Sequence, residues 1–172
     1  MIPIAEYGLA FSSMSEAQFC AQHPHPVLVH CADSSSPLKP LDATRGLTID
    51  RLVLEGNDGP ILPPLQSAYT VFPLQARLAG NPRIAIGCSH TCDVQISDTS
   101  ISRVHAFLER RGEEYVIWDN SSASGTQVNG EVIDQSDGTE LLAGDRVTLG
   151  FVDFLFLQPR DFYRLLSGLF AK

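Results

Sequence analysis

The chain has 172 residues, 44% of them hydrophobic, and its formal net charge is −8 at pH 7. This length predicts one domain with a small appendage, and the composition is sufficient for a hydrophobic core. The acidic balance argues against nucleic-acid binding, which requires a basic stripe. The membrane-protein class is also disfavoured, because no apolar run approaches the ~18 residues that a membrane-spanning helix needs.

Cysteine usage indicates a reducing compartment. The four thiols, Cys20, Cys31, Cys88 and Cys92, are too few for a disulfide scaffold. The first ten residues contain no basic residue and no cleavage-site pattern, so we expect no signal peptide and a cytoplasmic location. The cysteines and histidines within 20–31 and 88–92 lack the paired spacing of a zinc finger, and we predict neither a metal nor a cofactor.

The first predicted element is a short helix over Met14–Gln22. Ser15 and Gln18 match the capping box that begins many helices. The sequence His23-Pro24-His25-Pro26 ends the helix, because proline cannot continue its hydrogen bonds.

Two apolar runs, Val27–Val29 and Leu47–Leu54, are candidate strands. They lie in residues 1–64, which we interpret as an N-terminal extension that either caps the next domain or forms a loosely held arm. The cap is favoured, because exposed apolar strands in a free tail would promote aggregation. Pro63-Pro64 marks the boundary of the extension.

Residues 65–158 have the pattern of an all-β domain, with short apolar runs separated by turn residues. Alternation predicts a first strand whose inward face is formed by Thr70, Phe72, Leu74, Ala76 and Leu78. A later strand would place Val104, Ala106 and Leu108 on one face and His105, Phe107 and Glu109 on the other. Asn129-Gly130 predicts a type I′ hairpin. Two packed antiparallel sheets, a β-sandwich, accommodate this pattern.

Residues 159–172 change to a helical period. Phe162, Leu165, Leu166, Leu169 and Phe170 form one apolar stripe, which predicts an amphipathic C-terminal helix. We expect it to dock on the sandwich; the alternative is a helix that binds a partner or a membrane surface.

The most informative stretch runs from Arg83 to Gly130. It contains Ile84-Ala85-Ile86-Gly87, then Ile101-Ser102-Arg103-Val104-His105-Ala106, then a hydroxyl-rich run from Asp119 to Thr126. The strands would project loops 88–93, 97–103 and 119–126. Their hydroxyls and backbone amides are donors that suit a small anion.

These motifs, in this order and followed by L-x-x-G-D-R-V-x-L-G, resemble the forkhead-associated (FHA) family from about Tyr69 to Leu157. The resemblance implies an FHA/SMAD-like antiparallel β-sandwich whose apical loops bind phosphothreonine peptides, without catalytic activity. Carried over by position, it assigns phosphopeptide or partner binding to Cys88, Ser89, Ser102, Arg103, Ser122, Ala123 and Ser124. It assigns loop bracing to Gly87, His105, Gly125, Thr126 and Asn129.

Three of these positions depart from the family pattern. Cys88 stands where the family has a phosphate-binding arginine, Ser124 replaces the expected asparagine, and Ala123 precedes it. Loss of a charge-assisted pair with phosphate costs ~1.5–3 kcal/mol, or ~10–100-fold in affinity. Arg103, or Arg83 just outside the loop, could supply the missing cation. A Cys88–Cys92 disulfide that reshapes the site is a further alternative.

Two functions remain open for this fold. The first is an adaptor or signalling module that binds a phosphothreonine peptide; the second binds a protein without phosphate, as a scaffold subunit of a larger assembly. Catalysis is disfavoured, because Ser102 and His105 would face opposite ways on a strand and Cys88 with His90 has no third group to orient the imidazole. The expected partner is a protein or peptide, with no nucleic acid and no membrane; the oligomeric state is left open.

Overall fold

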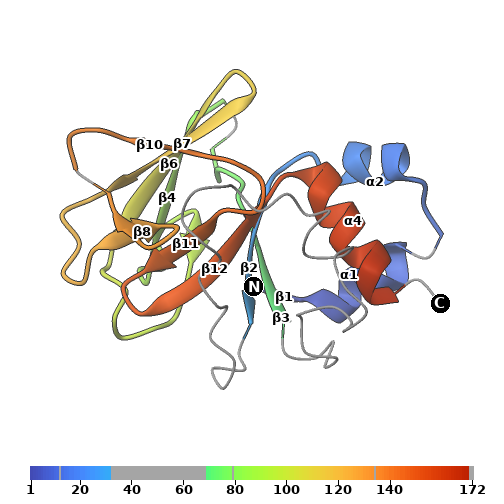
Figure 1. The fold of residues 1–172 in the computed structure, drawn as a ribbon, viewed down its shortest axis with the longest axis horizontal. Coiled ribbons are helices and arrows are strands. Elements are labelled where there is room, and N and C mark those ends of the chain that lie inside the picture. The colour runs from blue at the N-terminus through green and yellow to red at the C-terminus, as the bar shows by residue number, and fades with distance from the viewer. Residues whose placement is uncertain (12, 32–68, 79, 134, 171–172) are drawn as a thin grey trace.

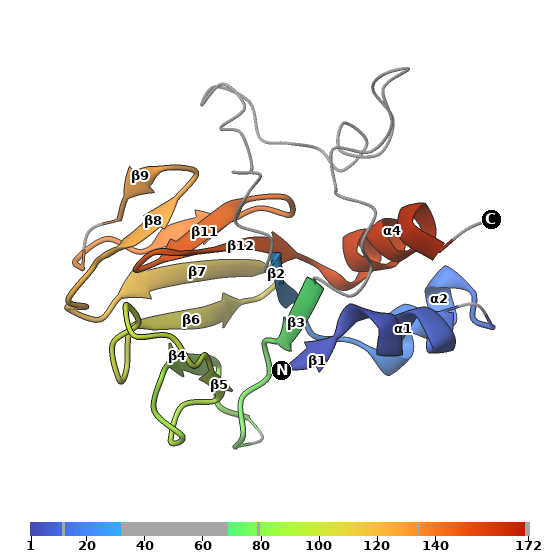
Figure 2. The same cartoon turned by 90° about the horizontal axis from the view of Figure 1, so that it is seen from below.

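The computed structural model describes residues 1–172 except 12, 32–68, 79, 134 and 171–172. Within the described residues the strands form two sheets that lie face to face (Figure 2). The larger sheet has the order β1 (Ile2–Pro3), β3 (Tyr69–Pro73), β2 (Val27–Cys31), β12 (Val152–Leu157), β11 (Arg146–Leu149), β8 (Thr126–Val128) and β9 (Glu131–Val132). The smaller has the order β10 (Thr139–Leu141), β7 (Glu114–Asp119), β6 (Ala106–Arg111), β4 (Arg83–Gly87) and β5 (Val94–Gln95).

The predicted β-sandwich is therefore confirmed. Every pairing between described strands is antiparallel except that of β4 with β5. The main core lies between the sheets and contains Ile86 and Leu108 from the smaller sheet and Val147 and Phe154 from the larger. Alternation along each strand sends these side chains inward.

Three helices, α1 (Ile4–Phe11), α2 (Glu16–Gln22) and α4 (Pro159–Phe170), gather at the β1–β3 side of the molecule (Figure 1). They share a second core with Val29 and Val71, to which α2 contributes Phe19 and α4 contributes Phe162 and Leu166. Strands β2 and β3 are thus buried on both faces, with Leu28 and Phe72 in the main core and Val29 and Val71 in the second. This explains why Val27–Val29 and Val71–Phe72 are continuously apolar instead of alternating.

The predicted helices are confirmed. Ser15 is the N-cap of α2, and its hydroxyl oxygen accepts a hydrogen bond from the Gln18 backbone N–H at 3.4 Å. The Gln18 side chain accepts from the Ser15 backbone N–H at 3.0 Å, which completes the predicted capping box. The apolar stripe of α4 packs into the second core, so the C-terminal helix docks on the sandwich as expected.

The strand predicted over Val27–Val29 is confirmed as part of β2. This strand comes from the predicted extension 1–64 and pairs with β3 and β12 in the interior of the larger sheet. The strand predicted at Leu47–Leu54 and the boundary at Pro63-Pro64 lie outside the described residues.

The extent of the first predicted strand is wrong. Strand β3 ends at Pro73, and the Leu78 side chain is 73% exposed, whereas Leu74 is buried. Pro73 has no N–H for a further ladder bond. Val71, on the face that the alternation left outward, is fully buried because the helices cover it.

The type I′ hairpin is confirmed at Asn129 and Gly130, whose φ angles are +54° and +88°. No described helix is long and apolar enough to cross a membrane.

The helical layer should contribute measurably to stability. We expect Leu166→Ala, which empties a fully buried position in α4, to lower the free energy of unfolding by about 2–5 kcal/mol. The matched control is Arg164→Ala in the same helix. Arg164 is exposed and only pairs with Asp161 at 3.7 Å, so its removal should cost at most about 1 kcal/mol. Urea unfolding of both variants measures the difference, and equal losses would contradict the docked position of α4.

Candidate functional site

Loops from both sheets meet at one end of the sandwich, which we call the apical end: residues 88–93, 97–103 and 119–126, and the turn at 150–151. The Cys88 and Ser89 N–H groups donate to the Ser102 and Arg103 carbonyl oxygens at 3.0 and 3.1 Å. The Ala123 N–H donates to the Ser102 hydroxyl oxygen at 3.0 Å. The structure therefore brings the 88–93, 97–103 and 119–126 loops together.

His105 joins two of these loops, 97–103 and 119–126, from inside. Its side chain is fully buried; Nδ1 accepts a hydrogen bond from the Ser102 N–H and Nε2 donates to the Gly125 carbonyl oxygen, each at 3.0 Å. Its backbone N–H donates to Ile86 O, and its carbonyl oxygen accepts from the Asn120 N–H, each at 2.8 Å. Because an amide N–H only donates, Nδ1 carries no proton and Nε2 does. Burial lowers the pKa of His105, so the folded protein keeps the imidazole neutral.

Asp119 organises the last loop. Its carboxylate accepts hydrogen bonds from the Ser122 N–H at 2.9 Å, the Ser122 hydroxyl at 2.6 Å and the Thr126 hydroxyl at 2.7 Å. Burial alone would raise the pKa of Asp119, but these hydrogen bonds outweigh it and the pKa lies below its ordinary value. A charged Asp119 thus holds the loop that carries Ala123 and Ser124.

Gly87 allows the first two loops to approach each other. A Cβ atom built there would overlap the Arg103 carbonyl oxygen and lie 2.9 Å from the Ser102 carbonyl oxygen. Only glycine permits this contact, which explains the glycine at the end of β4.

The residues predicted to bind a partner differ in whether their side chains already make hydrogen bonds or ion pairs within the described chain. Arg103 is exposed, and no hydrogen bond or ion pair of its guanidinium is found among the described residues; the same holds for the half-exposed Ser124 hydroxyl. The Ser89 hydroxyl shares a 2.8 Å hydrogen bond with Thr91. The Ser122 hydroxyl is directed to Asp119, so in the structure it helps to hold the loop.

Asn129, predicted to brace the loops, lies at the opposite end of β8 from Thr126. Its side chain donates to Asp145 at 2.9 Å and accepts from the Arg146 N–H at 3.0 Å. It therefore joins the β8–β9 turn to β11, and the structure does not bring it to the apical end.

Cys88 is half-buried and packs against the sandwich core. Cys92 is buried, and its thiol donates to the Arg103 carbonyl oxygen at 3.1 Å. Burial raises the pKa of Cys92, which makes its thiol unreactive. Both cysteines are free thiols, so the structure does not contain the disulfide considered from the sequence.

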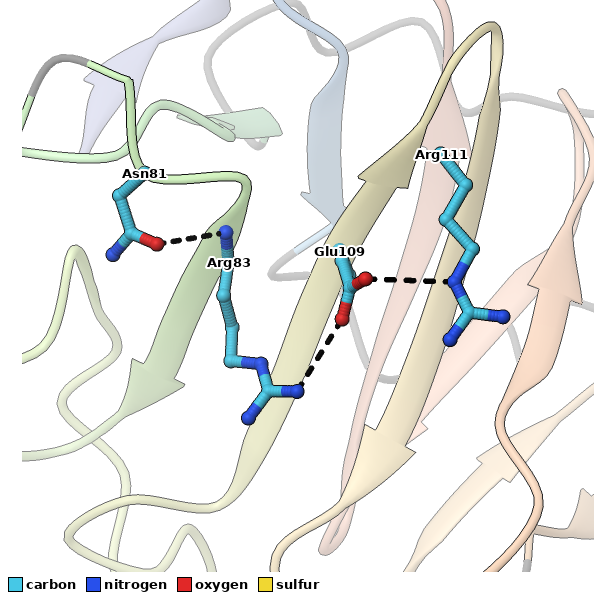
Figure 3. A network of polar contacts seen from close by, with 4 residues as sticks. All are labelled: Asn81, Arg83, Glu109 and Arg111. Carbon is cyan, nitrogen blue, oxygen red and sulfur yellow. Dashed lines mark hydrogen bonds and ion pairs between the residues drawn. The ribbon is translucent and has the colours of Figure 1, made fainter.

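Arg83 cannot replace the cation missing at position 88. It begins β4, five positions before Cys88, which places it ~16 Å away along the strand. Its guanidinium lies 3.3 Å from one carboxylate oxygen of Glu109, and the Arg111 guanidinium lies 3.5 Å from the other. Figure 3 shows the two arginines on either side of this carboxylate. The Arg83 guanidinium also lies 5.9 Å from the ring centre of Trp118. The interpretation of Arg83 as a neighbour of the loop is therefore wrong. Of the two arginines considered as substitutes for the cation missing at position 88, Arg103 remains.

The site contains little that could catalyse a reaction. Both ring nitrogens of His105 are occupied by backbone groups, so the imidazole is not available to Ser102 as a base. Among the described residues no cluster of His, Cys, Asp and Glu could hold a metal ion. The arrangement can offer hydroxyls, amides and the Arg103 guanidinium to a ligand.

Sequence reasoning overlooked two residues here. Asp119 was recognised only as the start of a motif, although an acidic residue before a serine-rich turn is a signal for an Asx-type hydrogen bond. Phe151 was not considered; its signal is an apolar residue directly after Gly150, in a turn where polar residues are usual.

Comparison with known proteins gives matches of three kinds. Residues 84–150 match the family model described as the FHA domain. The chain is 33% identical over 74 residues to the oxoglutarate dehydrogenase inhibitor of Corynebacterium jeikeium (strain K411), an alignment that covers 43% of this chain and 49% of that protein. The chain thus spans about half the length of this curated relative.

Among solved structures, the FHA domain of CT664 from Chlamydia trachomatis is 20% identical, with a TM-score of 0.48, over 77% of this chain and 97% of that chain. Mycobacterium tuberculosis EmbR, in complex with a low-affinity phosphopeptide, is 21% identical, with a TM-score of 0.49, over 89% of this chain and 28% of that chain.

The neutral state of His105 predicts how stability depends on pH. The unfolded chain binds a proton at the ordinary histidine pKa of 6.5, whereas in the folded state the pKa is lower. The free energy of unfolding should therefore be fully retained above about pH 6.5 and fall as the pH is lowered below it. Urea unfolding between about pH 7.5 and 5.5 measures this slope.

The control is His105→Gln, which is expected to be less stable at every pH but to show a shallower slope. Burial also lowers the pKa of His23, so the difference between His105→Gln and His23→Gln isolates the share of His105. An unchanged slope in His105→Gln would show that the imidazole is not held neutral.

Proposed function

Because residues 84–150 form an FHA domain, we propose that the apical end of this chain docks a protein segment and that a phosphorylated threonine of this segment binds to Ser102 and Arg103. The observation that carries the proposal is the exposed Arg103 guanidinium, without a partner among the described residues, next in the chain to Ser102. The Ser102 hydroxyl oxygen accepts from the Ala123 N–H, so its hydrogen can be donated to a phosphate oxygen.

The loops are suited to this role because they are held before any ligand arrives. His105 and Asp119 fix the backbone of the loops that carry Ser102 and Ser124. A ligand that binds preformed loops avoids the entropic cost of ordering them. The free Ser124 hydroxyl, where the family has asparagine, is a candidate for binding the peptide main chain.

The curated relative also supports a protein partner, since its name makes it the inhibitor of an enzyme. We propose an adaptor or signalling role in the cytoplasm, with 65–158 as the domain that carries the site and with residues 1–64 and 159–172 as extensions, the first of which adds β2 to its larger sheet. The net charge of −8 favours a basic partner by long-range attraction.

A second candidate is docking without phosphate, with the chain as a scaffold subunit. Cys88 favours it, because this side chain packs against the core and supplies no charge at the position of the family's arginine. The two candidates share the surface and differ in whether phosphate is required.

The role of Arg103 can be measured directly. We expect Arg103→Ala to weaken binding of a phosphothreonine-centred peptide library by about 10–100-fold, because a charge-assisted pair with phosphate is lost. Arg111→Ala removes the same charge from the outer face of β6 and should leave binding nearly unchanged. Calorimetry of both variants tests the assignment, and equal affinities would contradict it.

Position 88 distinguishes the two candidates. Cys88→Arg should raise the ratio of the affinity for the phosphorylated library to that for its unphosphorylated twin by about 10–100-fold relative to the native chain. The reason is that the substitution restores a bidentate phosphate contact. Cys88→Lys is the control, since it adds charge without the planar fork. If the native chain binds both libraries equally well, phosphate is not required and the second candidate is correct.

A further inference from the structure

Phe151 is the most exposed large hydrophobic residue of the described chain, with 84% of its surface accessible to solvent. It forms the turn between β11 and β12 together with Gly150. A fully exposed aromatic side chain gains from being covered by another apolar group.

The backbone at this position is firmly held. The Phe151 N–H donates to the Ser100 hydroxyl oxygen at 3.1 Å, and that hydroxyl donates to Asp98 at 2.6 Å. The Gly150 N–H donates at 3.0 Å to the Gly125 carbonyl oxygen, which also accepts from His105. The turn therefore belongs to the same hydrogen-bonded unit as the loops that carry Ser102 and Ser124.

Gly150 fixes the path of the turn. Its φ angle is +62°, and a Cβ atom there would lie 2.7 Å from the Ser100 hydroxyl oxygen. The aromatic ring of Phe151 thus projects from a rigid support, so a partner that covers it needs to order only one side chain.

From this geometry we infer that Phe151 is the apolar contact of the docking surface and selects partner segments that carry an aliphatic or aromatic side chain near the docked threonine. The inference rests on the proposed function, which it deepens by naming the partner's chemistry. The hydrogen bond from Gly150 to Gly125, the chain neighbour of Ser124, places the contact beside the proposed site.

The charges around the turn favour a protein segment over a lipid surface. Asp98 is exposed and accepts from both the N–H and the hydroxyl of Ser100, at 2.8 and 2.6 Å, which stabilises its charged form. Asp153, on β12, accepts from Thr148 at 2.6 Å. Two carboxylates next to Phe151 repel anionic lipids and favour a partner in which a basic residue neighbours the apolar one.

The test compares Phe151→Ser with Leu142→Ser. Leu142 is 57% exposed and directly follows β10, whose last residue pairs with Tyr115 at the end of β7 remote from Asp119, so its replacement removes apolar surface away from the apical end. The probes are a phosphothreonine-centred peptide library with randomised flanks and its unphosphorylated twin. Phe151→Leu, which keeps an apolar side chain, is the conservative variant.

The native chain and Leu142→Ser should enrich aliphatic or aromatic residues at one flanking position. Phe151→Ser should lose this enrichment and bind the selected peptides about tenfold more weakly, and Phe151→Leu should retain most of both. Unchanged enrichment and affinity in Phe151→Ser would overturn the inference while leaving the proposed function intact.

The remaining outcomes separate the two proposals. If the chain binds only the unphosphorylated library, and Phe151 is needed for the enrichment of apolar residues in it, the inference is supported and the phosphate requirement is refuted. No binding of either library by the native chain would overturn both. If Phe151→Ser instead converts a dimer to a monomer in sedimentation, without changing peptide selection, a second copy covers Phe151 and the inference is wrong.

Discussion

The buried imidazole of His105 is the contact on which the apical end depends, because it joins the 97–103 loop to the 119–126 loop in the interior. One ring nitrogen binds the backbone of Ser102 and the other that of Gly125. A neutral histidine is suited to this task, since it has one donor and one acceptor on opposite sides of a rigid ring. Protonation would place a donor against the Ser102 N–H and disrupt the bridge.

Burying the polar groups that hold the loops leaves other groups free for a ligand. Asp119, Ser122 and Thr126 satisfy one another inside the last loop, whereas Arg103 and Phe151 face solvent. The surface that results combines the Arg103 guanidinium with the Phe151 ring. The helices cover the larger sheet on the opposite side of the molecule. A second core lies between them and the sheet.

The sequence was sufficient for the sandwich, the capping box of Ser15 and the Asn129-Gly130 hairpin, because each depends on local periodicity or on φ > 0. It was not sufficient for β3, because burial of Val71 on the second face depends on helices from both ends of the chain. The resemblance assigned His105 a bracing role, but its burial was not predicted: alternation put His105 on the face opposite Ala106, whereas the loop before β6 turns its side chain inward. Arg83 and Asn129 lie at the ends of β4 and β8 that are remote from the apical end. Which strand ends lie together follows from the pairing of the strands, which the sequence does not show.

The most direct measurement of the central claim is the tautomer and charge of His105 in the folded protein, read from nitrogen chemical shifts in an NMR spectrum. The account predicts a neutral ring, protonated at Nε2 and bare at Nδ1, that becomes charged only at a pH below the ordinary histidine pKa of 6.5. A ring protonated at Nδ1, or one that becomes charged near its ordinary pKa of 6.5, would contradict it.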